Sequence, residues 1–179
     1  MNIDRVLAGK KAKSDGDYFE RLINEACERY KREGFAYIEK TPEPMKVIKP
    51  YSISKGQFIA HFDTTAQPDY KGTLSGGRAI CFEAKCTGKD KILQDRVTDA
   101  QTDALLTHAK LGAEVFILVG FFSKIIPSFY KIPFQIWYEM KTIYGRKYVL
   151  ETEIQDFKVG EQHIVDFLEV DKKRWLVKK

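Results

Sequence analysis

The chain lacks several features that would place it in a common protein class. It has no apolar run long enough to cross a bilayer, and its first residues, MNIDRVLAGKKAKSDGD, lack the apolar stretch of a secretory signal. Its three cysteines show no CxxC spacing, which argues against a zinc ribbon or a disulfide framework. It has neither a glycine-rich nucleotide loop nor a catalytic-triad motif. We therefore expect a cytoplasmic protein with reduced thiols and no membrane segment.

The composition that remains is that of a globular protein. Its 179 residues are 44% apolar and 31% charged, which is enough for one domain with a core. A net charge of +5 and a sequence pI of about 9.0 are compatible with a polyanion partner, although many unrelated domains share them. We expect a flexible basic arm over residues 1–17 and a single domain over residues 18–179.

Apolar periodicity predicts an α/β domain. Residues 18–33 have apolar side chains three and four positions apart, which is typical of a helix, and Gly34 follows them. A second helix is expected over residues 94–111. Strands are expected at FAYIEK, GGRAICFEAKC and AEVFILVGFF, and SFYKIPFQIWYEM is expected to run from a strand into a helix. This order predicts a mixed central sheet flanked by helices.

The strand GGRAICFEAKC carries charges where a core strand normally has none. Side chains alternate along a strand, so Glu83 and Lys85 share one face. If residues 69–77 form a turn between adjacent strands, Asp69 lies beside Glu83. Two converging carboxylates repel each other unless they bind a hard divalent cation, and oxygen ligands favour Mg²⁺, with Mn²⁺ as a possible substitute. A neighbouring lysine could then orient or deprotonate a water molecule, or hold a phosphate oxygen.

Simpler interpretations exist for each of these residues. A Glu-x-Lys pair is often a solvated ion pair on a strand face, worth well under about 1 kcal/mol. Glu20 could be an exposed helix residue that pairs with a neighbouring cation, and Gln101 could lie on a helix surface. The histidines are scattered, and we treat them as structural or surface residues.

Five segments, in order, resemble a known family. Pro68-Asp69 followed by Glu83-Ala84-Lys85 is similar to the PD-(D/E)xK nuclease motif. The chain from about Gly16 to Met140 further resembles the RecU family of Holliday junction resolvases. The first helix carries its Gly-x-x-Phe-Glu-x-x-Ile-Asn run, and TTAQPDYKG, CFEAK, DAQTDAL and GAEVFILVGF resemble its later segments.

This resemblance implies a restriction-endonuclease-like fold and Mg²⁺-dependent cutting of four-way DNA junctions in recombination and repair. It implies that Asp69 and Glu83 are metal ligands, that Glu20 is an outer carboxylate near the metal, that Lys85 is the catalytic lysine and that Gln101 lies near the site. Thr64 and Thr65 would face the scissile phosphate, although residues 66–68 separate them from Asp69 where the family has no gap. Cys81 also stands where the family tends to have an aspartate.

The resemblance also implies how DNA is bound. Residues of about 46–67 correspond to a protruding stalk, and a homodimer would place two sites on the two-fold symmetric junction. Possible further partners are recombination or branch-migration proteins. Basic side chains around the site could neutralise phosphates; the candidates are Lys46, Lys49, Lys71, Arg78 and Lys89. Two alternatives remain open: a PD-(D/E)xK nuclease acting on duplex, nicked or flap DNA, and a non-catalytic protein that binds branched DNA.

Overall fold

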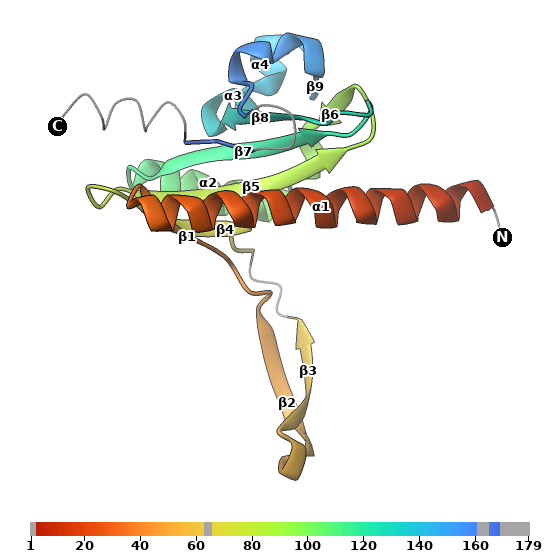
Figure 1. The fold of residues 1–179 in the computed structure, drawn as a ribbon, viewed down its shortest axis with the longest axis vertical. Helices are drawn as coiled ribbons and strands as arrows, with labels where there is room; N and C mark the ends of the chain where they lie inside the picture. The colour runs from red at the N-terminus through yellow and green to blue at the C-terminus, as the bar shows by residue number, and fades with distance from the viewer. Residues whose placement is uncertain (1–2, 63–65, 161–164, 169–179) are drawn as a thin grey trace.

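The computed structural model describes residues 3–62, 66–160 and 165–168. Its centre is a five-stranded sheet in the order β1-β4-β5-β7-β8 (Figure 1). The strands are β1 Ala36–Lys40, β4 Tyr70–Leu74, β5 Ala79–Thr87, β7 Glu114–Phe121 and β8 Ser128–Pro133. β5 and β7 are parallel and the other pairs are antiparallel. The predicted mixed sheet is confirmed, and no helix in the described ranges is long and apolar enough to span a bilayer.

Helices cover both faces of this sheet. α1 (Ile3–Glu33) lies on one face, and α2 (Asp99–Lys110), α3 (Phe134–Tyr138) and α4 (Met140–Tyr144) lie on the other side. The predicted second helix is therefore shorter than expected, because its first residues form a 3₁₀ turn, Gln94–Arg96, before Thr98 caps α2. A small sheet pairs β6 (Lys91–Leu93) with β9 (Tyr148–Leu150), and two 3₁₀ turns follow, Glu151–Glu153 and Gln155–Phe157.

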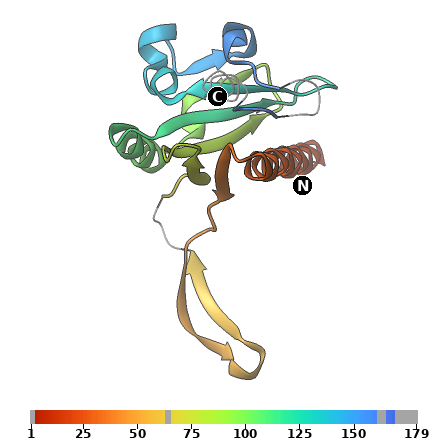
Figure 2. The ribbon, with the colours of Figure 1, turned by 60° about the vertical axis from the view of Figure 1, so that its left-hand side comes forward.

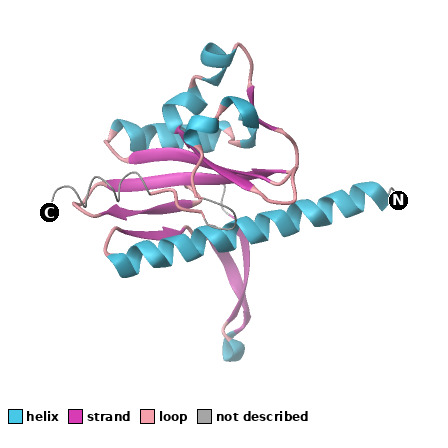
Figure 3. Ribbon diagram, turned by 45° about the horizontal axis from the view of Figure 1, so that its top comes forward, coloured by secondary structure: helices cyan, strands magenta, loops and turns pink. Residues whose placement is uncertain are grey.

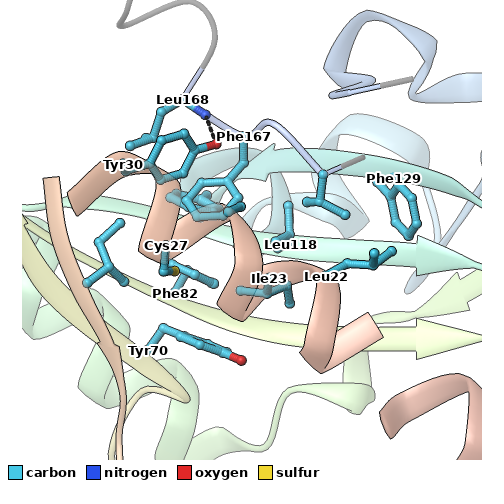
Figure 4. Close-up of a cluster of buried hydrophobic side chains, with 14 of the residues drawn as sticks. Leu22, Ile23, Cys27, Tyr30, Tyr70, Phe82, Leu118, Phe129, Phe167 and Leu168 are labelled. Carbon is cyan, nitrogen blue, oxygen red and sulfur yellow. Dashed lines mark hydrogen bonds between the residues drawn. The ribbon is translucent and has the colours of Figure 1, made fainter. Parts of the chain in front are cut away.

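The alternation along β5 divides the core into two clusters. Phe82 is fully buried between Tyr70 and Phe116, with ring centroids 4.8 and 4.6 Å away, and Phe167 from the C-terminal segment closes this cluster above α1 (Figure 4). Burying one such ring contributes about 1.5–3 kcal/mol. Cys81 points to the opposite face, where the second cluster packs against α2 and α3. The face on which Glu83 and Lys85 lie is therefore the α2 face.

α1 begins much earlier than the sequence indicated. The expected arm over residues 1–17 is wrong from Ile3 onward, because these residues are helical and continuous with the predicted helix (Figure 3). Alanine and lysine favour a helix, and the two interior glycines cost only about 1 kcal/mol each. The N-terminal half of α1 consequently extends past the end of the sheet.

The segment between Asp69 and Gly77 also differs from expectation. It is not one long turn, because Tyr70–Leu74 is the strand β4 and only a short turn joins it to β5. β4 also lies very close to β1. A Cβ on Gly72 would lie 2.0 Å from the carbonyl oxygen of Tyr37, so glycine is required there.

A hairpin projects from the body of the molecule (Figure 2). It consists of β2 (Met45–Ser52), a 3₁₀ turn (Ile53–Lys55) and β3 (Gln57–Phe62), with Gly56 in the left-handed conformation at φ 62°. Within the described ranges its strands pair with each other and with no other strand, and its apolar side chains, such as Tyr51 and Ile53, are exposed. The hairpin occupies the part of the chain for which the family resemblance implied a stalk.

Candidate active site

Asp69 and Glu83 meet because of the register between β4 and β5. Tyr70 pairs with Phe82, so the residue before Tyr70 lies next to the residue after Phe82. The backbone N–H of Ala84 donates a 3.0 Å hydrogen bond to Asp69 Oδ2 and fixes that carboxylate at the strand. The structure thus brings the two predicted acids to one place, although through a strand and not through the expected turn.

Lys85 lies between the two carboxylates. Its Nζ is 2.6 Å from Glu83 Oε2 and 3.1 Å from Asp69 Oδ2, and its side chain is only 15% exposed. This arrangement differs from a solvated ion pair, because the Glu83 side chain is fully buried. The simple interpretation of Glu-x-Lys as a surface pair does not apply here.

Gln101 holds Glu83 from the α2 side. Its Nε2 donates to Glu83 Oε2 at 2.7 Å, and its Oε1 accepts from the backbone N–H of Thr98 at 3.1 Å. Thr98 Oγ1 in turn accepts from the backbone N–H of Gln101 at 3.3 Å, which completes a capping box. Thr98 was not among the predicted site residues, although its Thr-x-x-Gln spacing is the sequence signal of that box.

The electrostatics of the site favour an additional cation. Burial, together with the charge of Asp69, raises the pKa of Glu83 from its ordinary value of 4.5 to about 7, despite the neighbouring ammonium. Burial opposes the charge on Lys85, but the two carboxylates outweigh it and raise the pKa of the ammonium. Without a further cation, one lysine therefore neutralises the pair only partly.

The donor set fits a hard divalent cation. Glu83 Oε1 is buried and has no hydrogen-bond partner, so one carboxylate oxygen of the site is left with an open acceptor position. Carboxylate oxygens supplemented by water suit Mg²⁺. In the part of the chain that the structure describes, no three acidic, histidine or cysteine side chains gather around one point. Asp69 and Glu83 are the two carboxylates that the described site brings together.

Glu20 is near this centre but is not brought into it. Its Oε2 forms a 2.6 Å ion pair with Lys40 Nζ on β1. Glu20 and Asp69 line the same cavity of about 390 Å³ between α1 and the end of β1. The structure therefore supports the helix-surface pairing for Glu20, and an outer role near a metal stays a prediction.

The predicted DNA-binding residues lie in different parts of the molecule. Lys71 donates to Gln67 at 2.6 Å on the face that carries the site, and Lys89 lies exposed just after β5. Lys46 and Lys49 lie on the exposed hairpin, away from the centre. Thr64 and Thr65 lie outside the described residues.

Arg78 makes local contacts at the opposite end of β5. Its guanidinium forms a 2.7 Å ion pair with Glu114, and its Nε donates to the carbonyl oxygen of Gly112 at 3.0 Å. These contacts fasten the start of β5 to the turn that follows α2. The side chain is thus engaged in the fold far along the strand from Lys85, and the structure gives no support to a phosphate contact near the site.

Comparisons with known proteins agree with the sequence resemblance. A family model described as RecU, recombination protein U, matches residues 14–173. The Holliday junction resolvase RecU of Streptococcus gordonii is 30% identical over 127 residues, which cover 66% of this chain and 63% of the relative. That of Streptococcus sanguinis is 35% identical over 79 residues, covering 42% and 39%, so these matches span less than two thirds of the streptococcal relatives.

Two further comparisons extend the coverage. The Holliday junction resolvase RecU of Bacillus pumilus is 25% identical over 177 residues, which cover 92% of this chain and 83% of the relative. Among solved structures, the Holliday junction resolvase Hjc of Archaeoglobus fulgidus aligns with a TM-score of 0.40 and 15% identity, covering 65% of this chain and 78% of Hjc.

Proposed function

The chain belongs to the RecU family, as the sequence resemblance predicted, and from that premise we propose that it is a metal-dependent endonuclease that resolves four-way DNA junctions. The observation that carries the proposal is the convergence of Asp69, Glu83 and Lys85, with both carboxylates within 3.1 Å of one ammonium and one Glu83 oxygen left without a partner. The names of the matched relatives support the choice of substrate.

Asp69 and Glu83 are the residues that would hold Mg²⁺, or Mn²⁺ in its place. When bound, such a cation polarises the phosphate and lowers the pKa of a bound water molecule. Asp69 is oriented by the N–H of Ala84, and Glu83 is oriented by Gln101, so neither acid has to reorganise when a ligand arrives.

Lys85 is best suited to stabilise negative charge. In the metal-free site the two carboxylates raise the pKa of Lys85, so its ammonium is protonated at neutral pH and can donate hydrogen bonds. Of the roles considered from the sequence, we favour contact with a phosphate oxygen, which uses this protonated form directly. An ammonium at this place would stabilise charge that develops on the phosphate as the P–O bond breaks.

The substrate and assembly follow from symmetry and shape. A homodimer would set two such sites against the two equivalent strands of a junction. The projecting hairpin, with exposed aromatic and basic side chains such as Tyr51 and Lys49, offers a surface for a branched substrate. We further propose that the protein acts in recombination and repair in the cytoplasm, where proteins of branch migration are possible partners.

The test compares a four-way junction with a linear duplex of matched sequence. We expect cutting of the junction with Mg²⁺ or Mn²⁺, none with EDTA, and much slower cutting of the duplex. Asp69→Asn and Lys85→Met should abolish cutting while junction binding persists, and Lys141→Gln on α4 is the matched surface control. Equal rates on both DNAs would point to a general nuclease, and binding without cutting by the wild type would point to a non-catalytic protein.

A further inference from the structure

A second cleft lies directly beyond the candidate active site. It has a volume of about 440 Å³ and is bounded by the first part of α1, from Ala8 to Asp15, and by the end of β5 with the β6 segment that follows. Figure 1 shows the end of β5 above this half of α1, and Figure 3 shows the helix continuing past the sheet. One wall of the cleft is formed by residues that the sequence predicted to be a flexible arm and that are instead part of α1.

Cys86 connects this cleft to the site. It lines both the cleft and the cavity that contains Asp69 and Glu20, and it follows Lys85 directly on β5. The two hollows are therefore neighbours: both are walled by α1, and they meet at the last part of β5. DNA that reaches Asp69 has one path along each hollow.

The charges of the two paths are opposite. Among the residues that the structure describes, the second cleft is lined by four cations and one carboxylate, Asp15; the cations are Lys11, Lys89, Lys91 and Arg96. The described lining of the cavity around Asp69 instead has four carboxylates and two lysines; its carboxylates are Asp17, Glu20, Glu43 and Asp69. A phosphate backbone is attracted to the first path, whereas the second, which contains the proposed metal ligand Asp69, attracts phosphate only with a cation bound.

The cations stand on both walls of the second cleft. Lys11 comes from α1, while Lys89 and Arg96 come from the segments on either side of β6. Lys91 and Arg96 are partly held in place, since Lys91 lies 4.8 Å from the ring of Tyr148 and Arg96 donates to the carbonyl oxygen of Cys86 at 3.5 Å. A backbone placed in the cleft would thus be contacted from two sides.

We infer that this cleft binds the phosphate backbone of the duplex arm that leaves the cut site, an inference that rests on the proposed nuclease function. The seven residue steps from Ala8 to Asp15 cover about 10 Å along the helix axis. DNA has one phosphate per ~3.4 Å of axis on each strand, so this length matches about three phosphates. The contacts are to backbone oxygens, and they carry no base sequence preference.

The experiment measures the affinity for a junction and for a duplex as a function of salt, in EDTA so that nothing is cut. The test variant combines Lys11→Gln with Lys89→Gln. The control combines Lys31→Gln with Lys110→Gln, which removes the same charge at the opposite end of the sheet. Losing two phosphate contacts should lower the slope of log K against log salt by about 2 and weaken binding about tenfold or more at 50 mM salt.

Each outcome decides the inference separately from the nuclease function. A lower slope in the test variant but not in the control supports the cleft, whether or not the wild type cuts DNA when Mg²⁺ is added. Equal slopes for test and control overturn the cleft even if cutting is normal. An effect on single-stranded DNA without an effect on duplex also overturns it, because the inferred ligand is the duplex arm.

Discussion

Replacing Glu83 by glutamine tests whether this carboxylate is buried in order to bind a cation. Glutamine has nearly the same shape, and its amide oxygen can still accept hydrogen bonds from Lys85 and Gln101, but it cannot ionise. In the folded protein the ionised Glu83 is destabilised by burial and by Asp69, whereas in the unfolded chain it is solvated. The substitution therefore removes a pH-dependent cost of folding.

The size and sign of this cost follow from the pKa. The folded pKa of about 7 lies above the ordinary value of 4.5, so between these values the folded state binds more protons than the unfolded state. The stabilisation is fully present below pH 4.5 and is lost as the pH rises through 7. From low to high pH, the raised pKa of Glu83 lowers the free energy of unfolding of the wild type by about 3 kcal/mol. Glu83→Gln has no ionisable group at this position, so its free energy of unfolding should not fall in this way.

The assay is urea unfolding of both proteins at pH 5 and pH 8, with EDTA and with Mg²⁺. In EDTA, the stability of Glu83→Gln relative to wild type should rise by about 2.5 kcal/mol between the two pH values, because part of the shift lies below pH 5. With Mg²⁺ at pH 8 the wild type should regain about 2.7 kcal/mol when the ion is at 100 times its dissociation constant, and the variant should regain much less. Glu25→Gln, on the exposed surface of α1, is the control.

Two results would refute this reasoning. If the relative stability of Glu83→Gln did not change between pH 5 and pH 8, Glu83 would not have a raised pKa. If Mg²⁺ stabilised the wild type and Glu83→Gln equally, the ion would bind elsewhere. Comparing differences between two pH values cancels the constant cost of weakening the contact with Lys85.

Two further substitutions test neighbouring contacts. Thr98→Val removes the hydroxyl of the capping box, so it should lower the free energy of unfolding by about 1 kcal/mol and slow junction cutting several-fold. Thr98→Ser keeps the hydroxyl and should keep both the stability and the cutting rate. Equal cutting rates for the two variants would show that Thr98 does not position Gln101. Arg78→Met breaks a half-exposed ion pair with Glu114, so the free energy of unfolding should fall by less than about 1 kcal/mol. The affinity for the junction, measured by fluorescence anisotropy, should stay within about twofold of the wild-type value. A lower salt slope for that variant would restore the DNA-contact role predicted from the sequence.

The centre of the site could be predicted because it depends on local rules. The two-residue period of a strand places Glu83 and Lys85 on one face whatever the rest of the fold does. The pairing with Asp69 was predicted for a partly wrong reason, since Tyr70–Leu74 is a strand. The prediction survived because a short turn between antiparallel strands preserves the same neighbours across the ladder.

Other features depend on contacts that the sequence does not display. The extent of α1 was missed because polar residues and two glycines resemble a linker, although nothing in that stretch forbids a helix. The engagement of Arg78 with Glu114 requires the parallel pairing of β5 with β7, which joins residues more than thirty positions apart. The basic cleft requires the extended α1 to lie beside the end of β5 and the β6 segment, and only the structure reveals that placement.

The spacing of Glu83 and Lys85 has a physical reason that is independent of any family. Two ionised carboxylates are costly to bury side by side without a cation, and a cation supplied by the chain itself lowers this cost whether or not a metal ion is present. A lysine two residues after Glu83 stays on the same face and reaches both acids, as the 2.6 and 3.1 Å distances show. A lysine one residue earlier would lie on the opposite face of β5 and point away from Glu83. The Glu-x-Lys pattern thus lets the site fold with its own counter-ion while one Glu83 oxygen stays open for another.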